Sequence, residues 1–443
     1  MLLRSRGGGT ETAMSTLRIV RREDPIEPRP TPPRWLTADV VLVLVVASTW
    51  GFAFSTFYLL PAFLGQELQA GPAEIGYVVG ILGVSTVAFA VAAAGWIDAL
   101  PRRRAMALGA LAMGVAALGF TRVHALGHVL EALRVLQGIS YALVVTSVGT
   151  SIAELVPHER LSQALGLSGA SMLVMNALAP AVAEPLAAAV GWRPVFLLAA
   201  LAALVSATLA TRIGTPVTPF VRPTAPAGDD RVRRAGLLVL LRGRLARQYA
   251  IILTLSGAAF GTVFTFQQPY ALALGRARVG GFFVAYAAAA IVVRVAFGHV
   301  PDRFGRHRVA LGALLVYAGV VLAMAAMRPR LLEVFGAIFG LAHGVFYPAI
   351  NAIAVTAAAP HERGRIVGVF TAAFSLGLWA GPTILGMVAA RAGYPAAFVA
   401  AAAGTVVAAV VLHRSREMRD AGAVSAAWPA TRRAGARSRR GGR

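Results

Sequence analysis

The four residues "PHER" stand at Pro157–Arg160 and again at Pro360–Arg363, an offset of 203 residues (360 − 157). Each copy follows one long apolar run and precedes another. Other pairs recur at nearly the same offset, so the repeat covers most of the chain. They are "ALGAL" at Ala107–Leu111 and Ala310–Leu314, Asp98 and Asp302, Pro180 and Pro382, and Gly191–Trp192 and Gly393–Tyr394. The sequence therefore predicts two halves built on one pattern.

The apolar runs between these markers indicate the class of protein. Hydrophobic residues make up 57% of the 443-residue chain and charged residues only 14%, against about 25% charged in an average soluble domain. Runs such as 40–60 and 75–97 contain no ionic group, and about 20 apolar residues are enough to cross a bilayer as a helix. Because lipid offers no hydrogen bonds to the backbone, such runs must be helical. We therefore expect an all-α integral membrane protein.

Twelve runs are long enough to be transmembrane helices. They lie near 39–63, 75–97, 104–121, 127–154, 162–188, 193–212, 248–273, 280–300, 308–327, 331–357, 365–389 and 394–413. The repeat offset spans six of these helices, an even number, so both halves have the same orientation in the membrane, as in transporters with parallel repeats. The predicted divisions are a tail at 1–34, a first six-helix half at 35–213, a linker at 214–247, a second six-helix half at 248–413 and a basic tail at 414–443.

The net charge of +23 is explained by the membrane. All 42 basic residues are arginines, and most lie in the tails and in the loops on one side of the predicted bundle. The opposite loops hold Arg122, Arg193, Arg276, Arg278, Arg328, Arg330 and Arg391. The bias of positive charge toward the cytoplasm then places both termini there, with anionic lipid headgroups, not nucleic acid, as the partner of the arginines. The first 34 residues have no apolar core, so we expect no cleavable signal peptide.

The stretch "GHVPDRFGRHR" at Gly298–Arg308 carries a family motif. It resembles the cytoplasmic loop signature of the major facilitator superfamily, G-x-x-x-D-R-x-G-R-R. The matching residues are Gly298, Asp302, Arg303, Gly305 and Arg306.

Two motifs in the first half agree with this resemblance in part. In "AGWIDALPRRR" the residues Asp98, Arg102 and Arg103 are kept, whereas two glycines and an arginine of the signature are replaced. "RVLQG" at Arg134–Gly138 is similar to the family's fourth-helix motif R-x-x-Q-G. Of the fifth-helix antiporter motif G-x-x-x-G-P-x-x-G-G, only Pro180 is present, which weighs against proton-driven export.

The resemblance implies a secondary transporter that works by alternating access, with a substrate site near the membrane midplane between the halves. It is nearest to the bacterial drug and metabolite efflux branch. That implies export of a small organic solute, a proton gradient as the energy source, no cofactor, and a multi-pass location in the bacterial inner (plasma) membrane. A monomer suffices, because one chain supplies both halves. An importer or exchanger of an organic anion stays open as an alternative, and a non-transporting membrane receptor is a weaker one.

The loop motifs supply the expected gating residues. Glycine allows the tight turn, and an aspartate there can accept hydrogen bonds from a helix N-terminus or an arginine. The resemblance implies that this contact stabilises one access state, although arginines that only fix the topology are the alternative. The gating candidates are Asp98, Arg102, Arg103, Gly298, Asp302, Arg303, Gly305 and Arg306.

Polar residues inside the predicted spans are candidates for the substrate and proton pathway, because ionisable groups are costly at membrane depth. The candidates are Glu131, Arg134, Gln137, Asn176, Glu184, Gln267, Gln268, Arg294, His343, Tyr347 and Asn351. Glu131 and Arg134 are three apart, so we expect an internal ion pair whose protonation frees the arginine; a surface carboxylate is the alternative for Glu131. Aromatic side chains at Trp50, Phe52 and Tyr58 could line the cavity or pack elsewhere.

Two of these groups fall on regular helical faces. Asn176, Pro180 and Glu184 are spaced four apart, with a kink expected at the proline. Glu184 is then a proton carrier or a solvated residue at the outer surface. His343, Tyr347 and Asn351 repeat every four residues and would suit a cavity or bonds to a neighbouring helix.

Arg294 has no carboxylate within its own helix. It therefore needs a distant partner, an anion in a cavity, or the interface.

No catalytic arrangement is present. A phosphate loop of the form G-x-x-x-x-G-K-[ST] is missing from the sequence, which argues against an ATP-driven pump. No nucleophile–base pair or metal-ligand set lies at matched depth in the predicted spans, so we expect no enzyme. His124 and His128 are four apart, but only Glu131 offers a third ligand, so we expect solvated histidines and no metal site.

Overall fold

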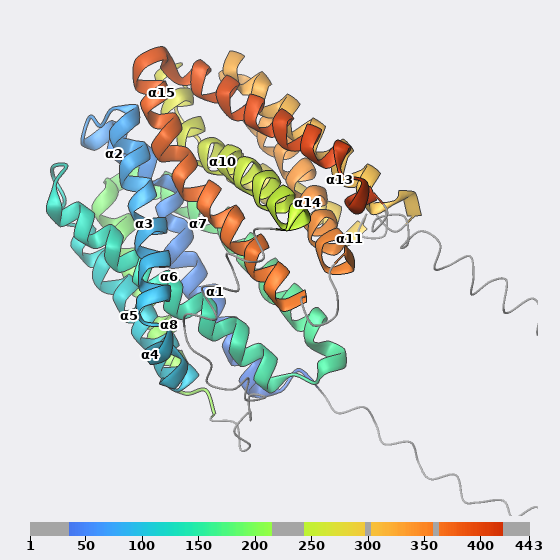
Figure 1. Ribbon diagram of the computed structural model, residues 1–443. Helices are drawn as coiled ribbons and strands as arrows, with labels where there is room; N and C mark the ends of the chain where they lie inside the picture. Colours follow the sequence, from blue (N-terminus) through green and yellow to red (C-terminus); the bar gives the residue numbers. More distant parts are fainter. Residues whose placement is uncertain (1–34, 215–242, 297–302, 358–362, 420–443) are drawn as a thin grey trace, which may run out of the picture. The chain divides into compact units, whose positions relative to one another are not determined.

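A computed structural model of the chain describes residues 35–214, 243–296, 303–357 and 363–419. Its elements are helices, and their labels are those of Figure 1. The first half holds α1 (Ala38–Thr56), η1 (Phe57–Leu59), α2 (Leu60–Glu67), α3 (Pro72–Ala92), α4 (Ala94–Ala99), α5 (Arg102–Phe120), α6 (His128–Leu155), η2 (His158–Arg160), α7 (Leu161–Val190) and α8 (Trp192–Ala210). The second half holds α10 (Arg244–Ala273), α11 (Gly281–Ala296), α13 (Arg306–Ala323), η3 (Met324–Ala326), η4 (Pro329–Leu331), α14 (Leu332–Ala357) and α15 (Arg363–Arg414). These elements belong to one unit, Leu36–Arg443.

The described helices confirm an all-α protein of membrane-spanning character. Ten helices are long and apolar enough to cross a bilayer, and α11 is a shorter apolar helix. The last span, Phe370–Arg414, is 45 residues long and is interrupted at Gly393, whose φ of 80° and ψ of 164° are not helical. The predicted boundary between the eleventh and twelfth spans falls at this glycine. Most predicted ends agree with the structure within a few residues, and the predicted linker lies mainly outside the described residues.

The first predicted span differs from the structure, because it is interrupted. α1 ends at Thr56 and a 3₁₀ turn, η1, leads into α2, which has Pro61 near its start. Proline has no N–H to donate to the carbonyl four residues earlier, here that of Phe57, so the chain takes the tighter 3₁₀ turn at this point. This break places Tyr58 and Pro61 in the wall of the cavity described below.

The helices cross back and forth, so their connections gather at two ends. One end is called the Gly71 end, and it holds the connections 68–71, 121–127, 191, 274–280, 324–331 and 393. The opposite end is called the Pro101 end, and it holds the connections 100–101 and 156–160. These two names assume no orientation in the membrane.

The sequence repeat reappears as a repeat of contacts near the Pro101 end. In the first half Arg102, at the start of α5, binds Glu154 near the end of α6, with Nε 3.2 Å from Oε1. In the second half Arg306, at the start of α13, donates to the hydroxyl of Thr356 near the end of α14 at 3.2 Å. Equivalent positions in the two halves thus join equivalent helices.

The halves contact each other chiefly through α3 and α15, which lie side by side (Figure 1). The approach needs glycine: a Cβ on Gly76 would stand 2.2 Å from the carbonyl oxygen of Pro382, and one on Gly83 would overlap the ring of Trp379. The Thr383 hydroxyl adds a hydrogen bond of 3.2 Å to the Gly76 carbonyl. These contacts run from Gly76, near the Gly71 end of α3, to Gly83 at the middle of the helix.

Two further contacts between the halves also lie toward the Gly71 end. The last part of α7 packs against the start of α11. The side-chain amide of Gln268 on α10 donates to the backbone carbonyl of Tyr58 in η1 at 2.6 Å. The halves are therefore joined near this end of the molecule.

Candidate functional site

A cavity lies between the two halves. Its empty volume is about 670 Å³, which includes space open to solvent. Its walls come from α1, η1, α2, α3 and α6 of the first half and from α10 and α15 of the second. The lining residues are Phe54, Phe57, Tyr58, Pro61, Val79, Leu82, Arg134, Tyr141, Phe260, Gly261, Phe264, Thr265, Leu378 and Trp379. An apolar, largely aromatic cavity with one charged group is typical of a site for a small organic ligand.

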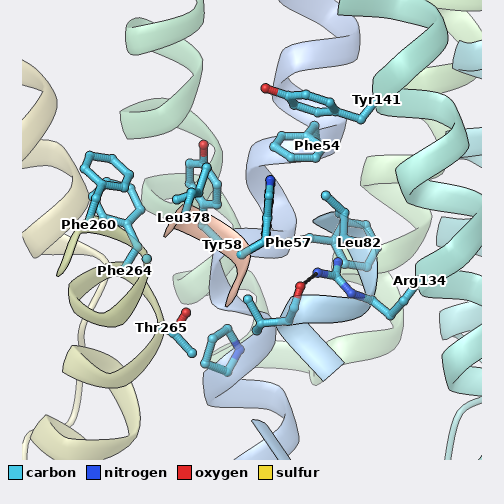
Figure 2. Close-up of a pocket in the computed structure, with 14 residues that line it drawn as sticks. Phe54, Phe57, Tyr58, Leu82, Arg134, Tyr141, Phe260, Phe264, Thr265 and Leu378 are labelled. Carbon is cyan, nitrogen blue, oxygen red and sulfur yellow. Dashed lines mark hydrogen bonds between the residues drawn. The ribbon is translucent and has the colours of Figure 1, made fainter. Parts of the chain in front are cut away.

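The aromatic wall is continuous across the halves. Phe54 stacks on Trp50 at 5.2 Å and lies 5.1 Å from Tyr141, measured between ring centroids. Tyr58 meets Phe264 of the second half at 5.5 Å. Figure 2 shows the rings of Phe54, Tyr58, Tyr141 and Phe264 together: α1 supplies the middle of the wall, α10 one side and α6 the other. Such offset and edge-on contacts stabilise the wall and leave ring faces for a ligand.

Arg134 is the charged side chain of this cavity, and only 3% of it is exposed. Its Nε donates to the carbonyl of Val78 at 3.0 Å, its Nη2 to the carbonyl of Val79 at 3.2 Å and its Nη1 to the amide oxygen of Gln137 at 2.6 Å. Figure 2 marks one of these bonds with a dashed line at Arg134. A guanidinium has five N–H donors, so one hydrogen on each terminal nitrogen remains for a ligand.

The expected ion pair of Glu131 with Arg134 is wrong. Glu131 instead binds the ring of His128 at 2.9 Å and the hydroxyl of Tyr77 at 3.1 Å, and 32% of its side chain is exposed. It lies in the first turn of α6, where a carboxylate interacts favourably with the helix dipole. Arg134 is turned toward α3. Among the described residues, no group of three acidic, histidine or cysteine side chains could hold a metal ion.

Glu184 joins the two halves. Its carboxylate accepts hydrogen bonds from the backbone N–H groups of Val279, at 2.5 Å, and Gly280, at 2.8 Å. These two groups come directly before α11, so the carboxylate caps the N-terminus of a helix in the other half. Asn176, two turns earlier on α7, accepts a hydrogen bond from Ser55 at 2.8 Å. The predicted face of α7 thus makes structural contacts to α1 and α11.

The predicted stripe on α14 is only partly buried. His343 is 7% exposed and its Nδ1 is 2.9 Å from the hydroxyl of Tyr286. Tyr347 packs edge-on against Phe374 at 5.1 Å. The stripe therefore adjoins α11 and α15, and His343 also contacts Phe260 of the cavity wall at 4.7 Å.

The two glutamines of α10 differ in their contacts. Gln267 and Gln268 are both fully buried. Gln268 donates a hydrogen bond to the backbone carbonyl of Tyr58 in the first half. Within the described residues, neither amide atom of Gln267 has a hydrogen-bond partner. Neither glutamine lines the cavity directly.

The gating candidates are described in part. Gly298 and Asp302 lie outside the described residues, and only the backbone of Asp98 is described. Arg102 and Arg306 make the contacts within each half given above, and Arg303 stands 5.6 Å from the ring of Phe304. Gly305 has a φ of 88° just before α13, a conformation that favours glycine. Arg103 is half-buried at the start of α5.

Sequence reasoning missed most of the cavity wall. Of the aromatic residues proposed for the first span only Tyr58 lines it, while Trp50 is buried and donates to Ser140 at 3.0 Å. Phe260 and Phe264 stand four apart on α10, a spacing that could have indicated one helical face. Phe54 and Tyr58 have the same spacing on either side of the break at Thr56.

The fold and the cavity define a polytopic membrane transporter made of two repeated halves. The family model for the Major Facilitator Superfamily matches residues 41–277 and 249–438, and the chain belongs to this family. It is therefore a membrane transporter and not an enzyme.

Relatives and solved structures agree with this. An uncharacterized MFS-type transporter of Burkholderia pseudomallei is 26% identical over 413 residues, covering 89% of this chain and 97% of its own. The staphylopine export protein of Staphylococcus aureus is 24% identical over 362 residues, covering 77% of this chain and 87% of its own. The crystal structure of a mutant of the nucleoside transporter NupG has a TM-score of 0.74 at 13% identity, covering 85% of this chain and 99% of its own.

Proposed function

We propose that this protein exports a small organic solute across the bacterial inner membrane by alternating access, in exchange for protons. The observation that carries the proposal is the cavity between the halves, whose aromatic walls come from both of them. A ligand held there touches both repeats. Movement of one half against the other then changes the side from which the ligand is reached.

The contacts between the halves correspond to one of the two access states. With the arginine bias taken as cytoplasmic, the Gly71 end faces outward, both termini are cytoplasmic, and the chain crosses the membrane twelve times. The halves are joined near the Gly71 end, through α3 with α15 and through Glu184 with α11. This is a state closed to the outside, in which an exporter takes up its solute from the cytoplasm.

Glu184 is the carboxylate best placed to couple this state to protons. Its bonds to Val279 and Gly280 use the negative charge at a helix N-terminus. Protonation removes that charge and weakens both bonds. Binding of a proton thus favours opening of the outer end, and loss of the proton restores the closed contact. The export relative supports the outward direction.

The test is proton movement in proteoliposomes loaded with a pH-sensitive dye and supplied with a panel of drugs, sugars and organic acids. We expect solute-evoked proton movement in the wild type, its loss in Glu184→Gln, and its retention in Glu131→Gln, because Glu131 lies at the surface with His128. Solute flux without a proton signal in the wild type would rule out proton exchange. Absence of any solute flux across the panel would favour a receptor.

A second candidate is import or exchange of an organic anion. Arg134 favours it, because this buried guanidinium faces the cavity and takes part in none of the ion pairs formed by the described residues. Uptake of an organic acid into proteoliposomes that is lost in Arg134→Gln but unaffected in Glu184→Gln would favour this candidate over proton-driven export.

A further inference from the structure

The second half holds a group of polar side chains that the proposed proton cycle does not use. They are Tyr286 and Arg294 of α11 and His343, Tyr347 and Asn351 of α14. The two helices pack along each other, with the carbonyl of Tyr286 so close to Gly340 that a Cβ there would stand 2.2 Å away. This packing brings the polar group to one place.

Several atoms of this group are buried and unsatisfied. Nε of Arg294, Nε2 of His343 and Oδ1 of Asn351 have no hydrogen-bond partner among the described residues. Buried polar groups without partners are rare and costly, and each one requires an explanation. Three in one region point to a place where a polar ligand binds.

The orphan nitrogens are donors. When the hydroxyl of Tyr286 donates to Nδ1 of His343, 2.9 Å away, the ring proton is on Nε2, which then needs an acceptor. The Nε of Arg294 always carries a hydrogen. Two donors without acceptors call for an electron-rich group between or beside them.

Among the described residues, no acidic side chain pairs with Arg294. None of the ion pairs formed by the described residues includes it. Helix packing places it beside His343, because a Cβ on Gly344 would stand 2.6 Å from the side chain of Val293. The neighbouring side chains of Tyr286 and His343 are not anions at neutral pH. Arg294 is partly buried and its Nε atom is fully buried. A cation at membrane depth without a partner is unfavourable, so a bound anion would relieve the cost.

This group adjoins the aromatic cavity. Phe260 lines the cavity, and its ring is 4.7 Å from that of His343. A ligand in the cavity can therefore reach the polar group from its aromatic side.

We propose that Arg294 and His343 form an acid-binding subsite, and that the transported solute is an organic acid with an apolar or aromatic body. The acidic group accepts charge-assisted hydrogen bonds from Arg294 and a bond from Nε2 of His343, while the body occupies the aromatic cavity. The proposal rests on the proposed function and adds the substrate class to it. It holds for export and for import.

The test measures binding rather than transport. Purified protein in nanodiscs is titrated by calorimetry with 2-naphthoate and with 2-naphthamide, which has the same ring body and no charge. We expect the wild type to bind the acid at least about tenfold more tightly than the amide, as is typical for charged hydrogen bonds. Arg294→Gln should remove this preference by weakening the acid alone, and Arg294→Lys should keep part of it.

The unchanged affinity for the amide shows that Arg294→Gln is folded. Arg391→Gln, which removes an exposed arginine of α15, serves as the matched control and should keep the preference for the acid. His343→Asn should weaken the acid several-fold. Equal binding of acid and amide by the wild type, or an intact preference in Arg294→Gln, would overturn the proposal.

The two proposals fail separately. Preferential binding of the acid without any solute flux in proteoliposomes would contradict the proposed transport function and still support the acid-binding subsite. Solute flux with proton exchange, but with no preference for acids in the binding assay, would support the transport function and contradict the acid-binding subsite.

Discussion

Glu131 and Glu184 are the same residue type in two different settings. Glu131 lies in the first turn of its own helix and binds a neighbouring, fully exposed histidine. Glu184 lies late in α7 and caps a helix of the other half. Only the second contact must break when the halves separate, so the two carboxylates should respond differently to substitution.

Loss of the Glu184 carboxylate should open the Gly71 end. We expect Glu184→Ala to raise the rate at which a membrane-impermeant maleimide, added outside, labels a single cysteine at Thr265→Cys in the cavity. Charged hydrogen bonds contribute about 1.5–3 kcal/mol each, so an increase of about tenfold or more is expected. The native chain has no cysteine, so there is no background.

The matched control is Glu131→Ala in the same Thr265→Cys background. It removes a carboxylate near the same end without touching a contact between the halves, and labelling should stay at the parent rate. Equal labelling in the two glutamate variants would contradict the role assigned to Glu184.

Arg134 should not tolerate lysine. Its three nitrogens each bond a different acceptor on α3 or α6, and one ammonium group cannot reproduce this planar fork. We expect Arg134→Lys to lower solute flux in proteoliposomes by about tenfold or more, since at least one charged bond of about 1.5–3 kcal/mol is lost. The thermal midpoint in detergent should fall by only a few degrees. Wild-type flux in the lysine variant would show that charge alone is required.

Helix packing separates the contacts that move from those that stay. α3 and α15 meet across the halves at Gly76, whereas α11 and α14 meet inside the second half at Gly340. At both positions a Cβ would stand 2.2 Å from a backbone carbonyl oxygen, so the steric conflict is the same. What differs is whether the two helices can part without unfolding.

This difference predicts that a glycine-to-alanine substitution has different effects at the two positions. Gly340→Ala should lower the thermal midpoint, because overpacking a fixed contact costs about 1–3 kcal/mol. Gly76→Ala should leave the midpoint near the parent value and raise external labelling of Thr265→Cys. Gly149→Ala, where nothing lies within 4 Å of the added carbon, should change neither. If Gly76→Ala lowers the thermal midpoint as much as Gly340→Ala does, α3 and α15 stay in contact in both access states.

The two halves together must rock if the cavity is to change sides. The halves are bonded to each other toward the Gly71 end, through Glu184 with Gly280 and through Gln268 with Tyr58. Each half has its own ion pair or hydrogen bond near the Pro101 end. A cross-link between the halves at the Gly71 end should therefore stop transport, while a cross-link within one half should not.

A cross-link between the halves should lock the transporter. We expect Pro180→Cys with Gly280→Cys, which lie next to each other on the two halves, to lose solute flux when joined by a short bifunctional methanethiosulfonate and to recover it on reduction. The control pair Arg102→Cys with Glu154→Cys lies within the first half and should keep its flux when cross-linked. Continued flux through the locked α7–α11 pair would exclude opening at that end.

The fold follows from features that are local in sequence. Apolar runs in lipid can only be helices, because their backbones have no other hydrogen-bond partner, and the repeated markers align one half with the other. Gly393, Pro61 and the glycines of α3 are visible in the sequence as breaks and small residues. The family motifs near Asp302 and Arg134 then agree with the same architecture.

The partners of the functional side chains could not be obtained in this way. Spacing along α6 suggested that Arg134 pairs with Glu131, yet the rotation of that helix turns the guanidinium toward the carbonyls of α3. Glu184 meets α11 only because the halves close at one end. Helix formation is set by neighbours within a few residues, whereas these contacts join helices that packing brings together from distant parts of the chain.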